Sequence, residues 1–254
     1  MITFTTAGIE GWVAAFLYPF LRILALMSSA PLFSHASVPV PLRVGLALAI
    51  AVAISGTLPA APFASPLSLA GAVLVVQQLV IGISIGLSMQ LVFAAVTLAG
   101  DMIGLQMGLS FAAFVDPQNA EQAPIVGAFL SLVLMLVFLS INGHLALIAA
   151  LVESFRALPI GPDGWRALDA MHLVAAGRGL FATGLALSLP VIGALLLVNL
   201  TLGVLTRTAP QLNLFAVGFP VTLVTGLVML LLAMPFIVPV LQQALEKGLG
   251  LLLR

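Results

Sequence analysis

The sequence predicts an all-α membrane protein with about six long hydrophobic helices, broken by proline and glycine and arranged in hairpins. Of its 254 residues, 62% are hydrophobic and 6% are charged, and the mean hydropathy is +1.29. Water-soluble domains carry about a quarter charged residues. Residues Val44 to Gly100 and Gln122 to Val152 contain no charged side chain. Since a spanning helix needs roughly 20 apolar residues, these stretches predict membrane helices.

The first predicted helix runs from Ile9 to Ala30 and contains Arg22. A cation inside a membrane helix is costly unless it reaches the interface or finds a partner. Arg22 is therefore expected near an interface or facing protein, with a direct role in a transport pathway as the alternative. Pro31 and Pro39 end the helix, because proline interrupts helical hydrogen bonding. A short second helix is expected from Val44 to about Leu58.

The third predicted helix, from about Leu67 to Met102, would be about 50 Å long at 1.5 Å per residue. This length exceeds the bilayer core, so the helix must tilt, break or project beyond the membrane. Four glycines fall near one stripe of it if it is continuous. Such a stripe allows another backbone to approach closely. These predicted helix-packing glycines are Gly82, Gly86, Gly100 and Gly104.

Three further hydrophobic segments follow, over about Pro124–Phe155, Gly179–Thr206 and Leu214–Leu253. The pair Asn142–Gly143 is typical of turns, so the first of them is expected to bend into two shorter helices. His144 could relay protons or bind a metal, but no second histidine lies at ligand spacing. We therefore expect a structural histidine that bonds a backbone carbonyl, and no metal.

The charged residues do not form a recognisable catalytic pattern. Arg22, Asp101 and Arg207 are the candidate buried charges, and Asp101 and Asp116 could be imagined as a carboxylate pair. Those two residues are separated by glycine-rich sequence, so their proximity cannot be argued. The chain has no cysteine, no phosphate-binding glycine loop and no zinc-binding helix motif. We predict no enzyme, no catalytic residue and no cofactor.

A glycine-rich interruption, Gly104 to Pro117, separates the two uncharged stretches, with the polar run Gln118–Gln122 behind it. Its residue types alone favour a plain interpretation. The glycines would be a helix-packing stripe, and Phe111 and Phe114 would belong to an ordinary hydrophobic core.

The stretch Gly104–Pro117 closely resembles the signature of the FliR family of flagellar biosynthetic proteins. Similar blocks occur in the same order along nearly the whole chain, so coincidence is a poor explanation. The clearest are Arg22–Met27, Gln77–Gly82, Asn142–His144, Asn199–Gly203, Arg207–Gln211 and Gly218–Pro220.

This resemblance implies a subunit of the flagellar type III export gate, in the bacterial inner membrane at the flagellar basal body. Such a subunit assembles with FliP and FliQ, next to FlhB and FlhA, in a channel for unfolded flagellar substrates. Residues 1–176 would form a FliP-like helical part with a central loop at about 104–122. Residues 177–254 would form a FliQ-like helical hairpin.

The resemblance also implies that the central loop plugs the closed pore. The implied plug residues are Gln106, Met107, Gly108, Leu109, Ser110, Phe111, Ala112, Ala113, Phe114, Val115, Asp116 and Pro117. The nearest alternative function is the homologous subunit of a virulence injectisome. A small-solute secondary transporter would predict an inverted repeat, which the sequence does not display. A membrane scaffold without a pore is the remaining alternative.

Overall fold

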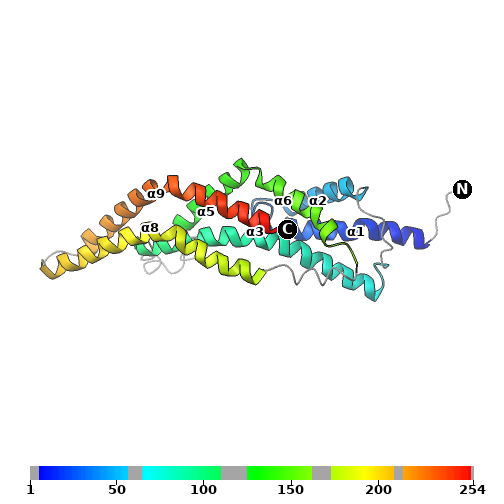
Figure 1. The fold of residues 1–254 in the computed structure, drawn as a ribbon, viewed down its shortest axis with the longest axis horizontal. Coiled ribbons are helices and arrows are strands. Elements are labelled where there is room, and N and C mark those ends of the chain that lie inside the picture. The colour runs from blue at the N-terminus through cyan, green and yellow to red at the C-terminus, as the bar shows by residue number, and fades with distance from the viewer. Residues whose placement is uncertain (1–5, 57–64, 110–124, 162–172, 209–213, 253–254) are drawn as a thin grey trace. The chain divides into compact units, whose positions relative to one another are not determined.

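The computed structural model describes residues 6–56, 65–109, 125–161, 173–208 and 214–252 (Figure 1). All regular secondary structure in these ranges is helical, which confirms the predicted all-α class. The helices are α1 (Thr6–Ser29), α2 (Val40–Ser55), α3 (Leu69–Gln106), α5 (Ile125–Ser140), α6 (Gly143–Ala157), α8 (Leu173–Thr208) and α9 (Leu214–Leu252).

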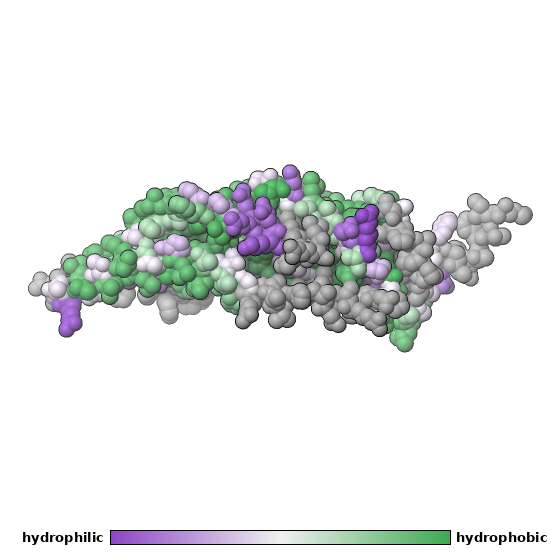
Figure 2. All heavy atoms as spheres, in the orientation of Figure 1, coloured by the Kyte–Doolittle hydropathy of each residue, from purple (hydrophilic) through white to green (hydrophobic). Residues whose placement is uncertain are grey.

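Four of the described helices contain stretches that are long and apolar enough to cross a membrane: Glu10–Ser29, Leu69–Gln106, Phe181–Thr208 and Val217–Gly248. A fifth span is possible if α5 and α6 are taken together, while α2 is shorter. Figure 2 shows hydrophobic side chains over much of the described surface on this face. The prediction of a membrane protein with several apolar helices is therefore confirmed.

The chain divides into two compact units, and α3 contributes to both. The first comprises Met1–Leu91, Asn142–Ala176 and Lys247–Arg254, and the second comprises Val92–Ile141 and Gly177–Glu246. One boundary, between Ala176 and Gly177, coincides with the expected start of the FliQ-like hairpin. In the second unit, α8 and α9 run antiparallel (Figure 1). Their likeness to FliQ stays a prediction.

Helix α2 begins at Val40, four residues earlier than the sequence suggested. Pro39 is its N-cap residue, with φ −61° and ψ 141°. Pro41, the second residue of the helix, lies in its first turn, where proline is well tolerated because the missing N–H has no intrahelical partner. Arg43 Nη2 donates to the carbonyls of Ser34 and His35 at 3.2 and 2.7 Å, which ties the turn before α2 to its first turns.

The fourth predicted segment forms two helices, α5 and α6, as the Asn142–Gly143 pair suggested. Asn142 has the left-handed value φ 56° and precedes the first residue of α6. Asparagine tolerates this conformation better than most residues do. By contrast, α3 is a single helix of 38 residues, or about 57 Å at 1.5 Å per residue.

In the first unit, α1 packs against α3 through two of the predicted packing glycines. A Cβ atom on Gly82 would overlap the carbonyl oxygen of Arg22 and lie 2.7 Å from the Cβ of Ala25. One on Gly86 would lie 2.9 Å from the backbone nitrogen of Ala30. No side chain fits at either position, so the two backbones are in close contact there.

Candidate functional site

The candidate site is the C-terminal end of α3, where the expected plug loop begins. Gly108 has φ 83°, a left-handed conformation that glycine adopts without strain. Its N–H donates to the carbonyl of Leu105 at 3.1 Å, and the N–H of Leu109 donates to the carbonyl of Gly104 at 3.1 Å. This pair of bonds is the Schellman motif, which satisfies helix-terminal carbonyls. The local sequence therefore gives α3 a definite end close to the first residues of the expected plug.

Met107, the residue at this helix end, is held by α9. Its side chain is only 3% exposed. Its carbonyl accepts a hydrogen bond from Thr222 Oγ1 at 3.2 Å. The thioether lies over Gly226, where a Cβ atom would be 2.8 Å from the sulfur and 2.9 Å from the terminal methyl. Residue 226 must therefore be small for Met107 to take this position.

Helix α5 crosses α3 at Gly100. A Cβ atom there would overlap the Cα of Gly127 and lie 2.8 Å from the carbonyl carbon of Val126. Gly104 is different, because a Cβ atom would find its nearest neighbour, Val126 Cγ2, at an ordinary contact distance of 3.8 Å. Of these two predicted packing glycines, only Gly100 lies at a contact that excludes a side chain.

Asp101 lies beside the same crossing. Its Oδ1 atom is buried and has no hydrogen-bond partner among the described residues. A Cβ atom on Gly127 would overlap that oxygen, so the carboxylate covers the glycine. One turn earlier, Thr97 Oγ1 and Ser131 Oγ are 2.8 Å apart and form a hydrogen bond between α3 and α5.

Helix α8 completes the packing around the end of α3. A Cβ atom on Gly184 would lie 2.8 Å from the carbonyl oxygen of Ala95 and 3.2 Å from Leu98 Cδ2. The hydroxyl of Ser188 approaches the sulfur of Met102 at 3.8 Å. Helices α5, α8 and α9 thus each contact α3 within one unit, and a glycine forms part of each contact.

The buried cation Arg22 belongs to the first unit and is fully enclosed, with 0% of its side chain exposed. Its Nε donates to Gln78 Oε1 at 2.8 Å. Nη1 donates to the carbonyl and the hydroxyl of Ser154, at 2.9 and 3.2 Å. Nη2 donates to the carbonyl of Leu158 at 2.8 Å, and the guanidinium lies 4.2 Å from the ring centroid of Phe155. Arg22 therefore joins α1 to α3 and to the end of α6.

These contacts explain how a charge is accommodated without a carboxylate partner among the described residues. The carbonyls at a helix C-terminus carry partial negative charge, and here they belong to α6. The network continues as Gln78 Nε2 donates to Gln77 Oε1 at 3.0 Å, and Gln77 Nε2 donates to the carbonyl of Gly161 at 2.8 Å. Both glutamines are fully buried. In each of them the side-chain amide nitrogen donates a hydrogen bond and the amide oxygen accepts one.

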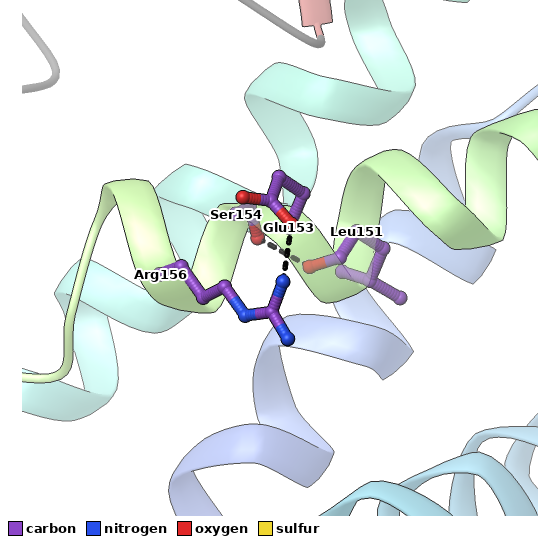
Figure 3. A network of polar contacts seen from close by, with 4 residues as sticks. All are labelled: Leu151, Glu153, Ser154 and Arg156. Atoms are coloured by element: carbon purple, nitrogen blue, oxygen red, sulfur yellow. Dashed lines mark hydrogen bonds and ion pairs between the residues drawn. The ribbon is translucent and has the colours of Figure 1, made fainter. Parts of the chain in front are cut away.

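Arg156, on the same helix, has a different environment. Its side chain is 77% exposed and pairs with Glu153 at 3.1 Å. Figure 3 shows this pair on α6 beside Ser154, whose hydroxyl also donates to the carbonyl of Leu151 at 2.6 Å. Exposed pairs of this kind contribute little to stability.

The remaining predicted site residues are placed as follows. Gln106 is the last residue of α3 and is partly buried, and Leu109 follows the helix end. The residues from Ser110 to Pro117 lie outside the described ranges. Arg207 was a candidate buried charge, but its side chain is exposed in the last turn of α8. A cation there interacts favourably with the helix dipole and needs no buried partner.

Two residues of this site, Thr222 and Gly226, were missed by sequence reasoning. A signal was present, because Gly218, Thr222 and Gly226 are small residues spaced four apart, and all three are buried on α9. Among the described residues, no three His, Cys, Asp or Glu side chains gather to hold a metal ion. Nδ1 of His144 is buried and has no partner there, so the expected carbonyl bond is not made by that atom.

The fold and site define a helical membrane protein with several apolar helices, in which the 38-residue helix α3 is packed through glycines and ends in a Schellman motif. The chain belongs to the bacterial export proteins, family 1. The sequence pattern of this family matches residues 13–248 of the chain.

Relatives in this family align along nearly the entire chain. The flagellar biosynthetic protein FliR of Pectobacterium carotovorum subsp. carotovorum is 42% identical over 253 residues, covering 99% of this chain and 96% of the relative. The FliR protein of Escherichia coli (strain K12) is 43% identical over 254 residues, with the same coverage. That of Bacillus subtilis (strain 168) is 33% identical over 226 residues, covering 88% of this chain and 87% of the relative.

Proposed function

We propose that this chain is a non-enzymatic subunit of the flagellar type III protein export gate. In this proposal it forms, with FliP and FliQ, the channel through which unfolded flagellar proteins leave the cell, next to FlhB and FlhA. The observation that carries the proposal is the family match over residues 13–248, with relatives named as flagellar biosynthetic proteins at up to 43% identity. Its place would be the bacterial inner membrane, in the flagellar basal body.

The surface of the helical hairpin supports a place among lipid and partner helices. Large hydrophobic side chains are exposed along α8 and α9, including Leu197 and Leu200 at 67% and Phe236 at 75%. Exposed apolar area of this extent is typical of membrane or protein contact surfaces. In the assembled gate, FliP-like and FliQ-like helices would cover some of these side chains and lipid would cover the others.

The central loop, Gln106 to Pro117, is proposed to plug the closed channel. Methionine and phenylalanine side chains can fill a narrow lumen and exclude water and ions, and methionine adapts readily in shape. A plug must also be held at its base. The capped end of α3 and the buried side chain of Met107 supply such a base.

Deletion of Gly108 to Phe114 tests the plug. The complex carrying the deletion should still co-purify with FliP and FliQ from native membranes, because the helices that pack around α3 are retained. Its resting conductance to ions should rise above that of the unmodified complex, because the channel has lost its seal.

The matched control is Phe111→Ala, which should leave conductance close to the unmodified level, since a seal shares its contacts among several side chains. Normal assembly of the deletion complex with background conductance would contradict the plug and favour a scaffold without a pore. A gene neighbourhood of injectisome components, in place of flagellar ones, would contradict the flagellar assignment alone.

A further inference from the structure

We propose that Thr222 and Gly226 of α9 are positioning residues for the plug, holding its base at Met107 while the channel is closed. In this proposal the contact between α9 and Met107 separates when the channel opens. The inference rests on the proposed function of the loop, and it concerns only described residues of one unit. It goes beyond that function because it names the contact that holds the plug closed, which is the contact of Met107 with Thr222 and Gly226 of α9.

The hydrogen bond from Thr222 can be released at little cost to α9. The single hydroxyl hydrogen has two acceptors in reach, the carbonyl of Phe219 at 3.0 Å and that of Met107 at 3.2 Å. A threonine hydroxyl donates only one hydrogen. If Met107 moved away, Thr222 would keep its bond to its own helix and no buried donor would be left unpaired. The contact therefore favours the closed position while remaining reversible.

The side chain of Met107 fits the same role. It fills the space over Gly226, which is buried and has no side chain of its own. The unbranched thioether has several rotatable bonds, so it can leave and re-enter this space without forcing a strained rotamer. The three atoms nearest to a Cβ atom at position 226 all belong to this flexible side chain, so Gly226→Ala should fold while displacing Met107.

Pro220 gives α9 a place to bend close to this contact. It lies inside the helix, two residues before Thr222. Proline lacks the N–H that would bond the carbonyl four residues earlier, and such sites are common kink positions. A change of bend there would move Thr222 relative to the end of α3 without unfolding either helix.

The first test compares Thr222→Val with Thr201→Val in complexes purified from native membranes. Both substitutions remove a hydroxyl and keep the shape of the side chain. Among the described residues, however, the Thr201 hydroxyl bonds within its own helix α8, to the carbonyl of Leu197 at 2.8 Å. An ordinary hydrogen bond shifts an equilibrium by about fivefold. Since the closed state predominates and the Thr222 hydrogen is shared with the carbonyl of Phe219, Thr222→Val should raise resting ion conductance by up to about fivefold. Thr201→Val should leave it unchanged.

The second test uses the absence of cysteine in this chain. In Met107→Cys/Gly226→Cys, a thiol at position 107 lies within reach of one at position 226, so mild oxidation should form a disulfide. This bond should stop export of flagellar substrates, and a reductant should restore it. The control is Thr97→Cys/Ser131→Cys, which joins α3 to α5 where the hydroxyls are 2.8 Å apart. That disulfide should leave export unaffected.

The outcomes separate this inference from the proposed function. If deletion of Gly108 to Phe114 raises conductance but Thr222→Val does not, the plug stands and the positioning role is overturned. Normal export through the oxidised 107–226 pair also overturns the inference, because the contact then need not open. If the deletion itself stays at background conductance, the plug fails and its positioning by α9 fails with it.

Discussion

Replacing Arg22 with methionine should destabilise the first unit strongly, although methionine is also a long, unbranched side chain that suits an apolar environment. The substitution removes four hydrogen bonds, to Gln78, to Ser154 twice and to Leu158. The carbonyl of Ser154 keeps a second donor, the N–H of Leu158 at 2.9 Å. The hydroxyl of Ser154 still donates to the carbonyl of Leu151 at 2.6 Å. Gln78 Oε1 and the carbonyl of Leu158 lose the donor that Arg22 supplies.

The magnitude follows from two ways of counting the loss. Interhelical hydrogen bonds in membrane proteins average about 0.6 kcal/mol each, so losing all of them costs roughly 2 kcal/mol. Leaving a buried polar group unpaired costs about 1–3 kcal/mol, and two such groups would cost about 2–6 kcal/mol. We expect a loss of about 2–5 kcal/mol for Arg22→Met. With about 2–4 °C per kcal/mol for a chain of this size, the unfolding midpoint should fall by about 4–20 °C.

The assay is thermal unfolding of the full-length chain within its assembled complex, measured as the fraction that stays monodisperse after heating. The matched control is Arg156→Met on α6, which removes an exposed arginine and should change stability by no more than about 0.5 kcal/mol. Arg22→Lys should fall between Arg22→Met and the unmodified chain. Lysine keeps the charge but lacks the planar fork that bonds several acceptors at once.

Equal midpoints for Arg22→Met and Arg156→Met would refute this reasoning, because burial and hydrogen bonding would then have no energetic consequence. If Arg22→Lys matched the unmodified chain, charge alone would account for the role of Arg22, and the geometry of the network would be irrelevant.

Three further pairs of substitutions test the packing described above. Gly100→Ala should destabilise the second unit by about 1–3 kcal/mol, because its methyl group would overlap the backbone of α5. Gly104→Ala should be tolerated. Equal thermal unfolding midpoints of the two complexes would show that the helices do not cross at Gly100. Asn142→Gly should preserve stability, but Asn142→Ala should cost about 1–2 kcal/mol because of its left-handed backbone; equal midpoints would contradict that conformation. Thr97→Val and Ser131→Ala should each cost about 0.6 kcal/mol, and the double variant should cost less than their sum if they share one bond; strict additivity would argue against the bond.

The sequence alone determined the class of protein and the approximate place of each helix. A chain with few charges and long apolar runs is stable only where water is excluded, and there the backbone must satisfy its hydrogen bonds internally. Uninterrupted apolar runs of about 20 residues or more do so as helices. Local chemistry also marked the break at Asn142, because a positive φ angle favours asparagine. The end of α3 was placed less well, since the helix continues to Gln106, four residues past the expected end at Met102. The ordered family blocks indicated the family, which the match over residues 13–248 confirms.

Boundaries and partners could be predicted less well. Helix α2 begins before the position that its prolines suggested, since proline is acceptable in a first turn. Arg22 was recognisable as a charge in need of a partner. Its acceptors, however, lie 56 to 136 residues away along the chain. Helical periodicity is a local property and says nothing about which distant helix crosses at a given turn.

Only the tertiary structure decided which small residues are contact points. Gly100 and Gly104 are equivalent in the sequence pattern, yet a backbone excludes a side chain at the first and not at the second. Likewise, the sequence did not indicate which helix contacts Met107, and only the structure places Thr222 and Gly226 of α9 against it. The physical reason is that a glycine stripe permits close approach, while the crossing point of two helices depends on every other contact between them.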